Sequence, residues 1–419
     1  MDKKGFLTLD DALKIQGPRS FMAMTKPVGS KCNLDCTYCY YLDKERFYGS
    51  KQEIFPEEML EKYIRDYIET NQVPEITFVW HGGEPLMAGI EYYKNVVKFQ
   101  KKHNYLNKKI NNSIQTNGTL LNEEWCKFFK RNNFLVGVSV DGPKDIHDTY
   151  RKNKSGFSSF TRTIKGIELL KTYKVEFNTL TVVNNLSEGR GREIYIFLKS
   201  IGSHYMQFLP AVDYIEPAGE TQRPIIVSPE LSGKAILAPW SVSDIGYGQF
   251  LIDIFDYWVR NDVGTYFIQL FDLTLGSWYG VNSAVCAYAQ TCGDNVAVEH
   301  NGDVFSCDHF VYPEYLIGNI KSMPLKAIIG SNAQIQFGIN KRNTLSGECL
   351  GCQYYFACGG ECPKHRHLLT KEGERKFSLC EGIKMFYTHS EPYMRYMVDL
   401  LNHEKSPSYV IPWAATINY

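Results

Sequence analysis

Three cysteines within eight residues constrain this chain more than any other feature of its sequence: Cys32, Cys36 and Cys39. A cubane iron–sulfur cluster usually takes four cysteines, one for each iron. A loop that supplies only three leaves one iron open, and an open coordination position is where a metal site performs chemistry. The spacing therefore predicts a catalytic [4Fe–4S] cluster. The alternative is a structural zinc site, which requires a fourth Cys or His nearby, and none lies within the loop.

The remaining cysteines are grouped rather than scattered. The chain has 12 cysteines, and eight of them lie from Cys286 to Cys380, the number that two complete four-thiolate sites require. Cys126 stands apart in an aromatic segment beside Trp125 and Phe128, so we expect it to be a small buried hydrophobic residue. No apolar run of the secretory type opens the chain. Since the cytosol keeps thiols reduced, metal ligation is favoured over a disulfide framework.

Charge and hydropathy exclude two classes of partner. Lysine plus arginine and aspartate plus glutamate each number 46. That balance gives no electrostatic reason to expect nucleic acid or an anionic membrane as a partner. No stretch approaches the roughly 18 consecutive apolar residues of a membrane span. We therefore expect a soluble, cytoplasmic protein that binds neither nucleic acid nor membrane.

Short β-rich runs alternate with amphipathic helical stretches over the first half of the chain. The predicted strands are Phe21–Val28, Glu75–Trp80, Asn112–Thr116, Leu135–Val140, Val175–Val183 and Tyr205–Leu209. The predicted amphipathic helices include Pro56–Glu69, Tyr92–His103, Asn122–Asn132, Ser159–Tyr173 and Arg192–Ser200. Strands that alternate with helices imply parallel strands joined by βα crossovers. Six such units are too few for a closed eight-stranded barrel, so the pattern predicts an α/β fold with a partial (β/α)6 barrel.

Polar and glycine-rich segments follow the first four predicted strands. They are the cysteine loop, His81–Pro85, Gln115–Gly118 and Ser139–Pro143. Active sites of parallel α/β folds lie at the carboxyl ends of the strands. Each segment alone is typical of a turn, but four that converge on one rim predict a functional site.

The chain divides into five predicted regions. Residues 1–19 form an N-terminal extension, 20–240 the partial barrel, 241–285 bridging helices, 286–381 a small cysteine-rich domain and 382–419 a short helical tail. The bridging helices are expected near Gln249–Arg260 and Tyr266–Tyr279, where aromatic residues predict packing rather than ligand contacts.

The cysteine loop together with Gly82-Gly83-Glu84-Pro85 resembles the radical S-adenosylmethionine (SAM) superfamily. The C-terminal pattern is more specific: Cys286-x5-Cys292-x14-Cys307, then Cys349-x2-Cys352-x5-Cys358-x3-Cys362-x17-Cys380. It resembles a SPASM domain, the module that holds two auxiliary [4Fe–4S] clusters. Within that class, the chain from about residue 20 resembles the anaerobic sulfatase-maturating enzymes. The likeness extends over Lys26–Gly29, Cys32–Tyr41, Trp80–Pro85, Gln115–Leu121, Val136–Pro143, Gly302–Phe310 and Cys358–Pro363. One departure, Pro85-Leu86-Met87 where many relatives have Pro-Thr-Leu, alters no expected ligand.

The resemblance implies three [4Fe–4S] clusters and SAM as cofactors. The SAM-binding cluster would be held by Cys32, Cys36 and Cys39, the first auxiliary cluster by Cys286, Cys292, Cys307 and Cys362, and the second by Cys349, Cys352, Cys358 and Cys380. With four ligands each, the auxiliary clusters have no free iron for a substrate, which favours electron transfer. The spacings alone would also permit two zinc sites, but a redox-silent metal would leave the radical chemistry without an electron acceptor.

The resemblance further implies six SAM contacts: Tyr38, Gly82, Gly83, Ser139, Arg151 and Val212. The tyrosine would lie against the adenine, and the two glycines would let the backbone approach the methionine amino group, because a Cβ there would obstruct it. The serine and the arginine would bind the ribose and the carboxylate of SAM, and the valine would supply an apolar or backbone contact. From the residues alone, the last three are typical of a strand-end polar group, a surface arginine and an ordinary core residue.

The implied reaction places a base at Asp308. In the family a radical formed from SAM takes a hydrogen from the Cβ of a cysteine or serine in a sulfatase chain, and loss of an electron and a proton leads to Cα-formylglycine. Asp308 follows the ligand Cys307 and stands at the position of the family's proposed proton acceptor. An ordinary aspartate and a thiol differ by about 4.6 pKa units, roughly 6 kcal/mol. Either burial raises the pKa of Asp308, or deprotonation is coupled to formation of the carbon radical, which we favour. The alternative for Asp308 is a turn residue with a local Asx-type hydrogen bond.

The expected partners are a sulfatase polypeptide and an electron donor such as flavodoxin or ferredoxin, with cysteine and serine equally open as the target. The alternative within the enzyme class is another SPASM peptide-modifying enzyme that forms thioether or carbon–carbon crosslinks. Many of those carry an added N-terminal domain, for which the twenty or so residues before the first predicted strand are too few. A multi-cluster electron carrier would leave the three-cysteine loop and the SAM-shaped rim unexplained.

Overall fold

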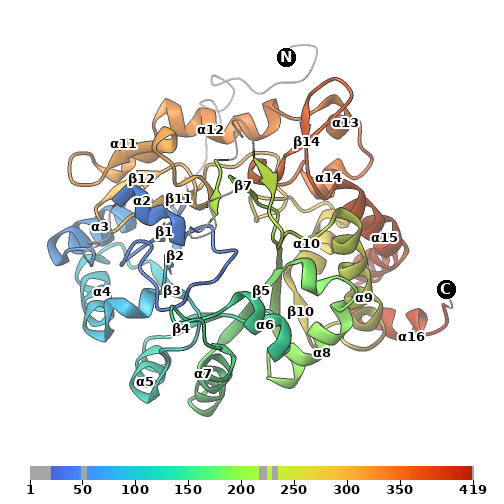
Figure 1. Ribbon diagram of the computed structural model, residues 1–419, viewed down its shortest axis with the longest axis horizontal. Helices are drawn as coiled ribbons and strands as arrows, with labels where there is room; N and C mark the ends of the chain where they lie inside the picture. Colours follow the sequence, from blue (N-terminus) through green and yellow to red (C-terminus); the bar gives the residue numbers. More distant parts are fainter. Residues whose placement is uncertain (1–19, 49–53, 217–223, 229–234, 418–419) are drawn as a thin grey trace. The chain divides into compact units, whose positions relative to one another are not determined.

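The computed structural model describes residues 20–48, 54–216, 224–228 and 235–417 (Figure 1). Its internal contacts divide the chain into two compact units. The first unit comprises residues 1–138, 151–176 and 290–344, and the second comprises residues 139–150, 177–289 and 345–419. Both units are therefore assembled from segments that lie far apart in the sequence. The predicted N-terminal extension, residues 1–19, lies outside the described residues.

A mostly parallel sheet forms the centre of the first unit. Its strands are β1 (Met22–Thr25), β2 (Glu75–Trp80), β3 (Lys109–Thr116), β4 (Phe134–Ser139), β11 (Asn295–Val298), β12 (Asp303–Phe305) and β13 (Leu316–Asn319). They lie in the order β4-β3-β2-β1-β11-β12-β13. Strands β1 to β4 and β11 pair in parallel, whereas β11, β12 and β13 pair antiparallel. Only Ser139, the last residue of β4, belongs to the second unit.

Four longer helices accompany the parallel strands of the first unit: α3 (Glu57–Thr70), α4 (Ile90–His103), α5 (Glu123–Arg131) and α7 (Phe160–Thr172) (Figure 1). Aromatic side chains join α3 and α4 to β2. The ring centroid of Trp80 lies 6.5 Å from that of Tyr63 on α3 and 5.8 Å from that of Tyr93 on α4. All three side chains are fully buried. The large apolar surface that they bury holds the helices against the sheet.

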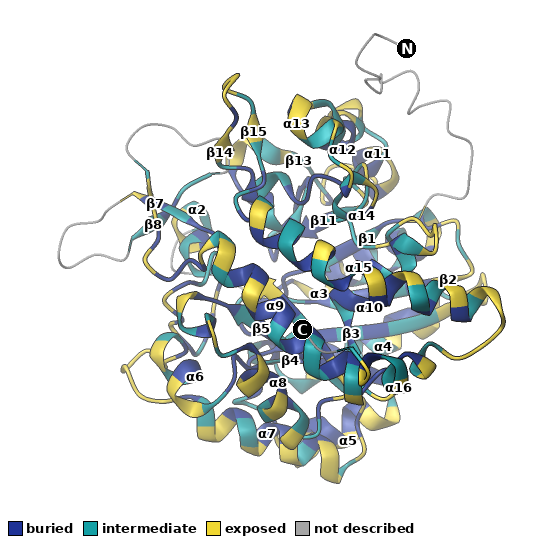
Figure 2. Cartoon of the chain, turned by 90° about the vertical axis from the view of Figure 1, so that its right-hand side faces the viewer, coloured by how far each residue is buried: buried dark blue, intermediate teal, exposed yellow. Residues whose placement is uncertain are grey.

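The second unit joins a short parallel sheet to long helices. Its parallel strands are β5 (Phe177–Val183), β6 (Tyr205–Pro210) and β10 (Phe267–Ile268), and its longer helices are α8 (Gly191–Ser200), α9 (Asp244–Asn261), α10 (Gln269–Trp278) and α15 (Cys380–Asn402). Helices α9, α10 and α15 alternate buried and exposed residues, as amphipathic helices do (Figure 2). Helices α9 and α15 meet at two glycines: a Cβ on Gly248 would lie 2.5 Å from the carbonyl oxygen of Gly382.

Apart from the 12-residue helix α12, the remaining elements are short. The helices are α2 (Glu45–Tyr48), α6 (Lys144–Tyr150), α11 (Leu325–Ile329), α12 (Asn332–Asn343), α13 (Gly347–Leu350), α14 (Tyr355–Cys358) and α16 (Val410–Ala414). The 3₁₀-helices are η1 (Leu42–Lys44), η2 (Pro85–Ala88), η3 (Asn185–Ser187), η4 (Asp308–Phe310), η5 (Pro313–Tyr315), η6 (Pro363–His365) and η7 (Pro407–Tyr409). The small strands are β7 (Tyr214–Glu216), β8 (Ile225–Ile226), β9 (Ile236–Leu237), β14 (Leu368–Leu369) and β15 (Arg375–Lys376). Within the described ranges, no helix combines the length and the apolar character needed to span a bilayer.

All six predicted strands are confirmed, but the first or last residue of some of them differs from the prediction for local chemical reasons. Strand β1 ends at Thr25 because Pro27 has no N–H to continue the ladder. Strand β5 begins at Phe177 because Val175 still belongs to the end of α7: its N–H donates to the Leu170 carbonyl at 2.9 Å, after Lys174 at φ 54°.

Two predicted helices differ from the structure. The helix predicted over Tyr266–Tyr279 begins only at Gln269, because Phe267 and Ile268 pair with β6 as strand β10. The tail predicted to be short contains α15, which runs for 23 residues from Cys380. Its apolar face packs on α9, and this burial stabilises the long helix.

Candidate functional site

The three cysteines of the cysteine loop all belong to the first unit. Cys32 and Cys36 are buried and Cys39 is half-buried. The N–H of Leu34 and the side-chain amide of Asn117 donate to Cys32 Sγ at 3.4 and 3.8 Å. Burial, and next the nearby Glu84, raises the pKa of the Cys32 thiol well above its usual value. Because an iron ligand must be a thiolate, this thiol would lose its proton on coordination.

Hydrogen bonds tie the cysteine loop to the loops after β2 and β3. Asn33 accepts from the Asn117 amide at 2.9 Å and donates to Thr119 Oγ1 at 2.8 Å. The fully buried carboxylate of Glu84 accepts from Thr116 Oγ1 at 2.7 Å and from the Asn117 N–H at 2.9 Å. Burial raises the pKa of Glu84 to about 7 against these hydrogen bonds. The predicted convergence of the first three strand-end loops is therefore confirmed within the first unit.

The two glycines after β2 are required by the cysteine loop itself. A Cβ on Gly83 would lie 2.1 Å from the Lys31 carbonyl oxygen, and one on Gly82, at φ +121°, would lie 2.8 Å from the Gly29 carbonyl oxygen. The Gly83 N–H donates to that Gly29 carbonyl at 2.9 Å. Only residues without a Cβ let these two backbones come so close. The glycines therefore have a structural requirement in addition to any contact with SAM.

Tyr38 and Arg151 lie together in the first unit. The Arg151 guanidinium carbon is 5.5 Å from the centre of the Tyr38 ring, and both residues are buried. The Ser159 hydroxyl donates to the Arg151 carbonyl at 2.7 Å and fixes the backbone there. Arg151 is thus not the surface arginine that its sequence context alone would suggest. Ser139 and Val212 belong to the second unit, where Val212 is buried after β6.

Asp308 lies in a buried polar cluster of the first unit. One carboxylate oxygen forms an ion pair with Lys26, and the other accepts from the Tyr40 hydroxyl. The ammonium of Lys26 has no exposed surface, lies 3.1 Å from His81 Nδ1 and sits 4.4 Å above the centre of the Tyr41 ring. Asp308 is therefore held on both oxygens by side chains rather than by a local turn.

Burial and the charge of Lys26 together shift the pKa values of His81 and Asp308. Burial, and next the charge of Lys26, lowers the pKa of His81 to about 4, so its ring is neutral near pH 7. Its Nδ1 accepts the Gly82 N–H at 2.7 Å. Burial alone would raise the pKa of Asp308, but the Lys26 charge outweighs it and holds that pKa well below its usual range. Of the two alternatives for Asp308, the one in which burial raises its pKa is not supported, because a buried cation lies in contact with the carboxylate.

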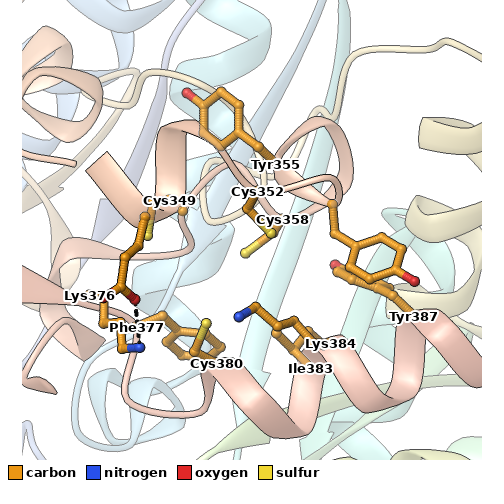
Figure 3. Close-up of a pocket in the computed structure, with 13 residues that line it drawn as sticks. Cys349, Cys352, Tyr355, Cys358, Lys376, Phe377, Cys380, Ile383, Lys384 and Tyr387 are labelled. Atoms are coloured by element: carbon orange, nitrogen blue, oxygen red, sulfur yellow. Dashed lines mark hydrogen bonds and ion pairs between the residues drawn. The ribbon is translucent and has the colours of Figure 1, made fainter. Parts of the chain in front are cut away.

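Four cysteines line one cavity of the second unit (Figure 3): Cys349, Cys352, Cys358 and Cys380. The cavity encloses about 460 Å³, including the part open to solvent. Helix α15 presents Cys380 from its first turn, where the Asp244 carboxylate accepts the N–H groups of Glu381 and Gly382 at 3.2 and 2.7 Å. Four thiols that face one cavity are the donor set of a cubane cluster, so these residues fit the group that the sequence predicts.

The other predicted set of four cysteines is divided between the units. Cys292 and Cys307 belong to the first unit, and Cys286 and Cys362 belong to the second. The Cys292 N–H donates to the Gly338 carbonyl at 3.2 Å, and Cys307 directly precedes η4 and Asp308. Cys362 is buried, and its carbonyl accepts the His365 N–H at 2.9 Å. Cys126 is fully buried on α5, as predicted.

Comparison with known proteins agrees with this arrangement. Residues 27–198 match the Radical SAM superfamily, and residues 286–353 match an iron–sulfur cluster-binding domain. A serine-type anaerobic sulfatase-maturating enzyme from Bacteroides thetaiotaomicron is 45% identical over 390 residues, which are 93% of this chain and 94% of that protein. The chain belongs to the anaerobic sulfatase-maturating enzymes.

Two further similarities extend over almost the whole of this sulfatase-maturating enzyme. A cysteine-type anaerobic sulfatase-maturating enzyme from Clostridium novyi is 33% identical over 393 residues, 92% of this chain and all of that protein. The structure of native anSMEcpe with bound AdoMet and Cp18Cys peptide aligns with a TM-score of 0.78 at 31% identity, covering 91% of this chain and 99% of that chain. The predicted fold class, a radical SAM α/β domain followed by a SPASM domain, and the predicted enzyme class are thereby confirmed.

Sequence reasoning assigned no role to three members of the Asp308 cluster: Lys26, His81 and Tyr40. Lys26 carried one signal, since it is a charged residue inside the predicted strand Phe21–Val28. No such sequence signal marked Tyr40. Tyr40 and Tyr41 both follow the cysteine ligand, and the sequence does not show which of the two rings faces Asp308.

Proposed function

We propose that this enzyme oxidises a cysteine or serine of a sulfatase active-site motif to Cα-formylglycine under anaerobic conditions. The observation that carries the proposal is the buried Asp308 cluster, which joins the residue after Cys307 to the strand that leads into the three-cysteine loop. Membership of the family supports the same reaction. The substrate would be a segment of a sulfatase polypeptide.

The ligands would divide as the sequence predicts. Cys32, Cys36 and Cys39 would hold the SAM-binding cluster; Cys286, Cys292, Cys307 and Cys362 the first auxiliary cluster; and Cys349, Cys352, Cys358 and Cys380 the second. When bound, these three [4Fe–4S] clusters and SAM supply a 5′-deoxyadenosyl radical that removes a hydrogen atom from the target Cβ and a path for the electron that leaves the substrate. The donor set of the second auxiliary site, four thiols on one cavity, supports this division.

Residues of the first unit would orient SAM. Tyr38 would lie against the adenine, and the Arg151 guanidinium, 5.5 Å from the centre of the Tyr38 ring, would bind the SAM carboxylate through its planar fork. Gly82 and Gly83 would present backbone groups to the methionine amino group. In the second unit, Ser139 would bind the ribose and Val212 would give an apolar or backbone contact.

Asp308 would accept the proton from the target thiol or hydroxyl. Because Lys26 holds the pKa of Asp308 low, the gap to an ordinary thiol exceeds the roughly 6 kcal/mol of a normal aspartate. Proton transfer before hydrogen abstraction is therefore disfavoured. The carboxylate, kept ionised and fixed by Lys26 and Tyr40, is suited to take the proton as the carbon radical forms.

The electron donor would be a low-potential carrier such as flavodoxin or ferredoxin. The enzyme would work in the cytoplasm, since eleven cysteine ligands must stay reduced until iron is bound and the cytosol maintains that state.

The test is an incubation of reduced, reconstituted enzyme with SAM and a Cys-x-Pro-x-Arg peptide, beside the same peptide with serine. We expect 5′-deoxyadenosine together with a peptide that has exchanged its sulfur and two hydrogens for one oxygen, or, from serine, lost two hydrogens. A peptide that loses two hydrogens per crosslink but yields no aldehyde-reactive product would indicate a crosslinking enzyme. Absence of 5′-deoxyadenosine would indicate an electron carrier. Either outcome would contradict the proposal.

A further inference from the structure

Two lysines line the cavity of the second unit together with its four cysteines: Lys376 and Lys384. Lys384 follows Cys380 by four residues on α15, so the two side chains lie on one face of the helix. In Figure 3 the ammonium end of Lys384 points into the space between the thiols of Cys352, Cys358 and Cys380. The lysine therefore faces the four sulfurs rather than the solvent alone.

The acidic residues near the cavity affect the two lysines differently. Lys376 Nζ lies 2.9 Å from Glu348, which also lines the cavity, so that pair contributes almost no net charge there. Lys384 Nζ lies 3.2 Å from Glu381, but Glu381 is not part of the lining. The side chain of Lys384 is 37% exposed, so it lies at the rim of the cavity in partial contact with solvent. Of the two lysines, Lys384 is therefore the one whose positive charge acts on the cavity.

The ammonium of a lysine is positively charged near pH 7. A fixed positive charge at the edge of a cavity of low dielectric acts strongly on charge that is added inside it.

We propose that Lys384 sets the reduction potential of the cluster held by Cys349, Cys352, Cys358 and Cys380. A cubane with four thiolates is an anion, and reduction adds one more negative charge to it. Net charge, hydrogen bonds and solvent exposure set the potential of such a cluster. A cation at the rim stabilises the reduced form more than the oxidised form and raises the potential, which makes the cluster a better electron acceptor. This inference rests on the proposed ligand set.

The experiment is an anaerobic redox titration of the full, reconstituted enzyme, followed by EPR. We expect Lys384→Gln to shift one reduction step to lower potential by about tenfold in its equilibrium constant, about 59 mV for one electron. Lys384→Glu shifts the same step further in the same direction, and Lys384→Arg keeps it near the wild-type value. The matched control is Lys405→Gln, an exposed lysine beyond the end of α15, which leaves every step in place.

The iron content of each protein distinguishes a failure of this inference from a failure of the proposed ligand set. An enzyme variant with full iron and an unmoved potential would overturn this inference and leave the proposed function standing, as would an equal shift in the Lys405→Gln control. A wild-type enzyme that binds too little iron for three clusters would overturn the ligand set and this inference with it. A graded shift of one step, in the order arginine, glutamine, glutamate, supports the assignment of Lys384.

Discussion

At the scale of single residues, the ion pair between Lys26 and Asp308 has the largest effect on the proposed chemistry. Both side chains are buried, so each charge depends on the other for its stability. The sequence places Asp308 next to a cysteine ligand, but it does not reveal that a lysine 282 positions earlier (308 minus 26) lies in contact with it. The family resemblance therefore implied a base at Asp308, but nothing in the sequence indicated the cation that lowers its pKa.

Replacement of Lys26 by methionine tests this pair. The variant leaves the Asp308 carboxylate buried without its cation, so its pKa rises, and loss of one partner of a buried pair costs about 3–5 kcal/mol of stability. We expect formylglycine formation to fall about a hundredfold and the ratio of 5′-deoxyadenosine to formylglycine to rise. Lys26→Arg retains part of the activity.

The matched control for this change is Lys62→Met, which removes a half-exposed i,i+4 partner of Asp66 on α3. Its cost should be about 0.3–0.5 kcal/mol, with normal product formation. Wild-type product formation by Lys26→Met would contradict the role assigned to the ion pair.

Glu84 should make stability depend on pH. Its pKa is raised from 4.5 to about 7 in the folded protein, so the folded state binds a proton that the unfolded state has lost in this window. The stability that this proton gives is fully present below about pH 4.5 and is lost as the pH rises through about 7, by up to about 3 kcal/mol. In Glu84→Gln this dependence disappears. The measurement is Tm between pH 5 and pH 8, and parallel Tm curves for the two proteins would refute the assignment.

At the scale of elements, the strand-end loops and their convergence were predictable, whereas one of the strand pairings behind them was not. Period and composition place β2 at Glu75–Trp80 without error. The pairing of β1 with β11 was not predicted, because Asn295–Val298 is four residues long and lies some 270 positions from its parallel partner. So short a run carries no periodicity of its own. As a result, the segment with Cys307 joins the same sheet as the strand before the cysteine loop.

Gly83→Ala tests the close approach of two loops. The added Cβ would meet the Lys31 carbonyl oxygen at 2.1 Å, a backbone atom that cannot turn away. We expect a loss of about 1–3 kcal/mol or more in stability, together with lower iron content, because the cysteine loop must move. Denaturant unfolding and iron analysis measure both effects.

Gly276→Ala is the control for this substitution. Gly276 lies within α10 with no atom within 4 Å of an added Cβ, so alanine there should be neutral or stabilise by about 0.5–1 kcal/mol. If both variants behaved alike, the loops would not be packed as closely as described.

At the scale of the whole molecule, cysteine spacing carried most of the information. It separated Cys126 from the eleven expected ligands, and Cys126 is indeed buried in the apolar face of α5. The family resemblance, rather than the spacing, grouped Cys349, Cys352, Cys358 and Cys380, and these four line one cavity. The division of the chain into two units made of interleaved segments was not visible in the sequence, because contacts between distant segments leave no local pattern.

Iron content should follow the cysteine sets. The reconstituted enzyme is expected to hold about twelve irons, four for each cubane. Cys352→Ala should remove about four of them, since a cluster with a missing ligand is lost, whereas Cys126→Ala should keep all of them because that thiol only packs in the core. Equal iron in the two variants, or zinc in the purified protein, would be inconsistent with the proposed sets.

The most direct test of the central claim is the fate of the hydrogen on the target Cβ. A sulfatase peptide carrying deuterium at the Cβ of its cysteine or serine is incubated with the reduced enzyme and SAM. We expect one deuterium to appear in 5′-deoxyadenosine for each formylglycine formed. Unlabelled 5′-deoxyadenosine alongside an oxidised peptide would contradict it, because the hydrogen would then have come from another position.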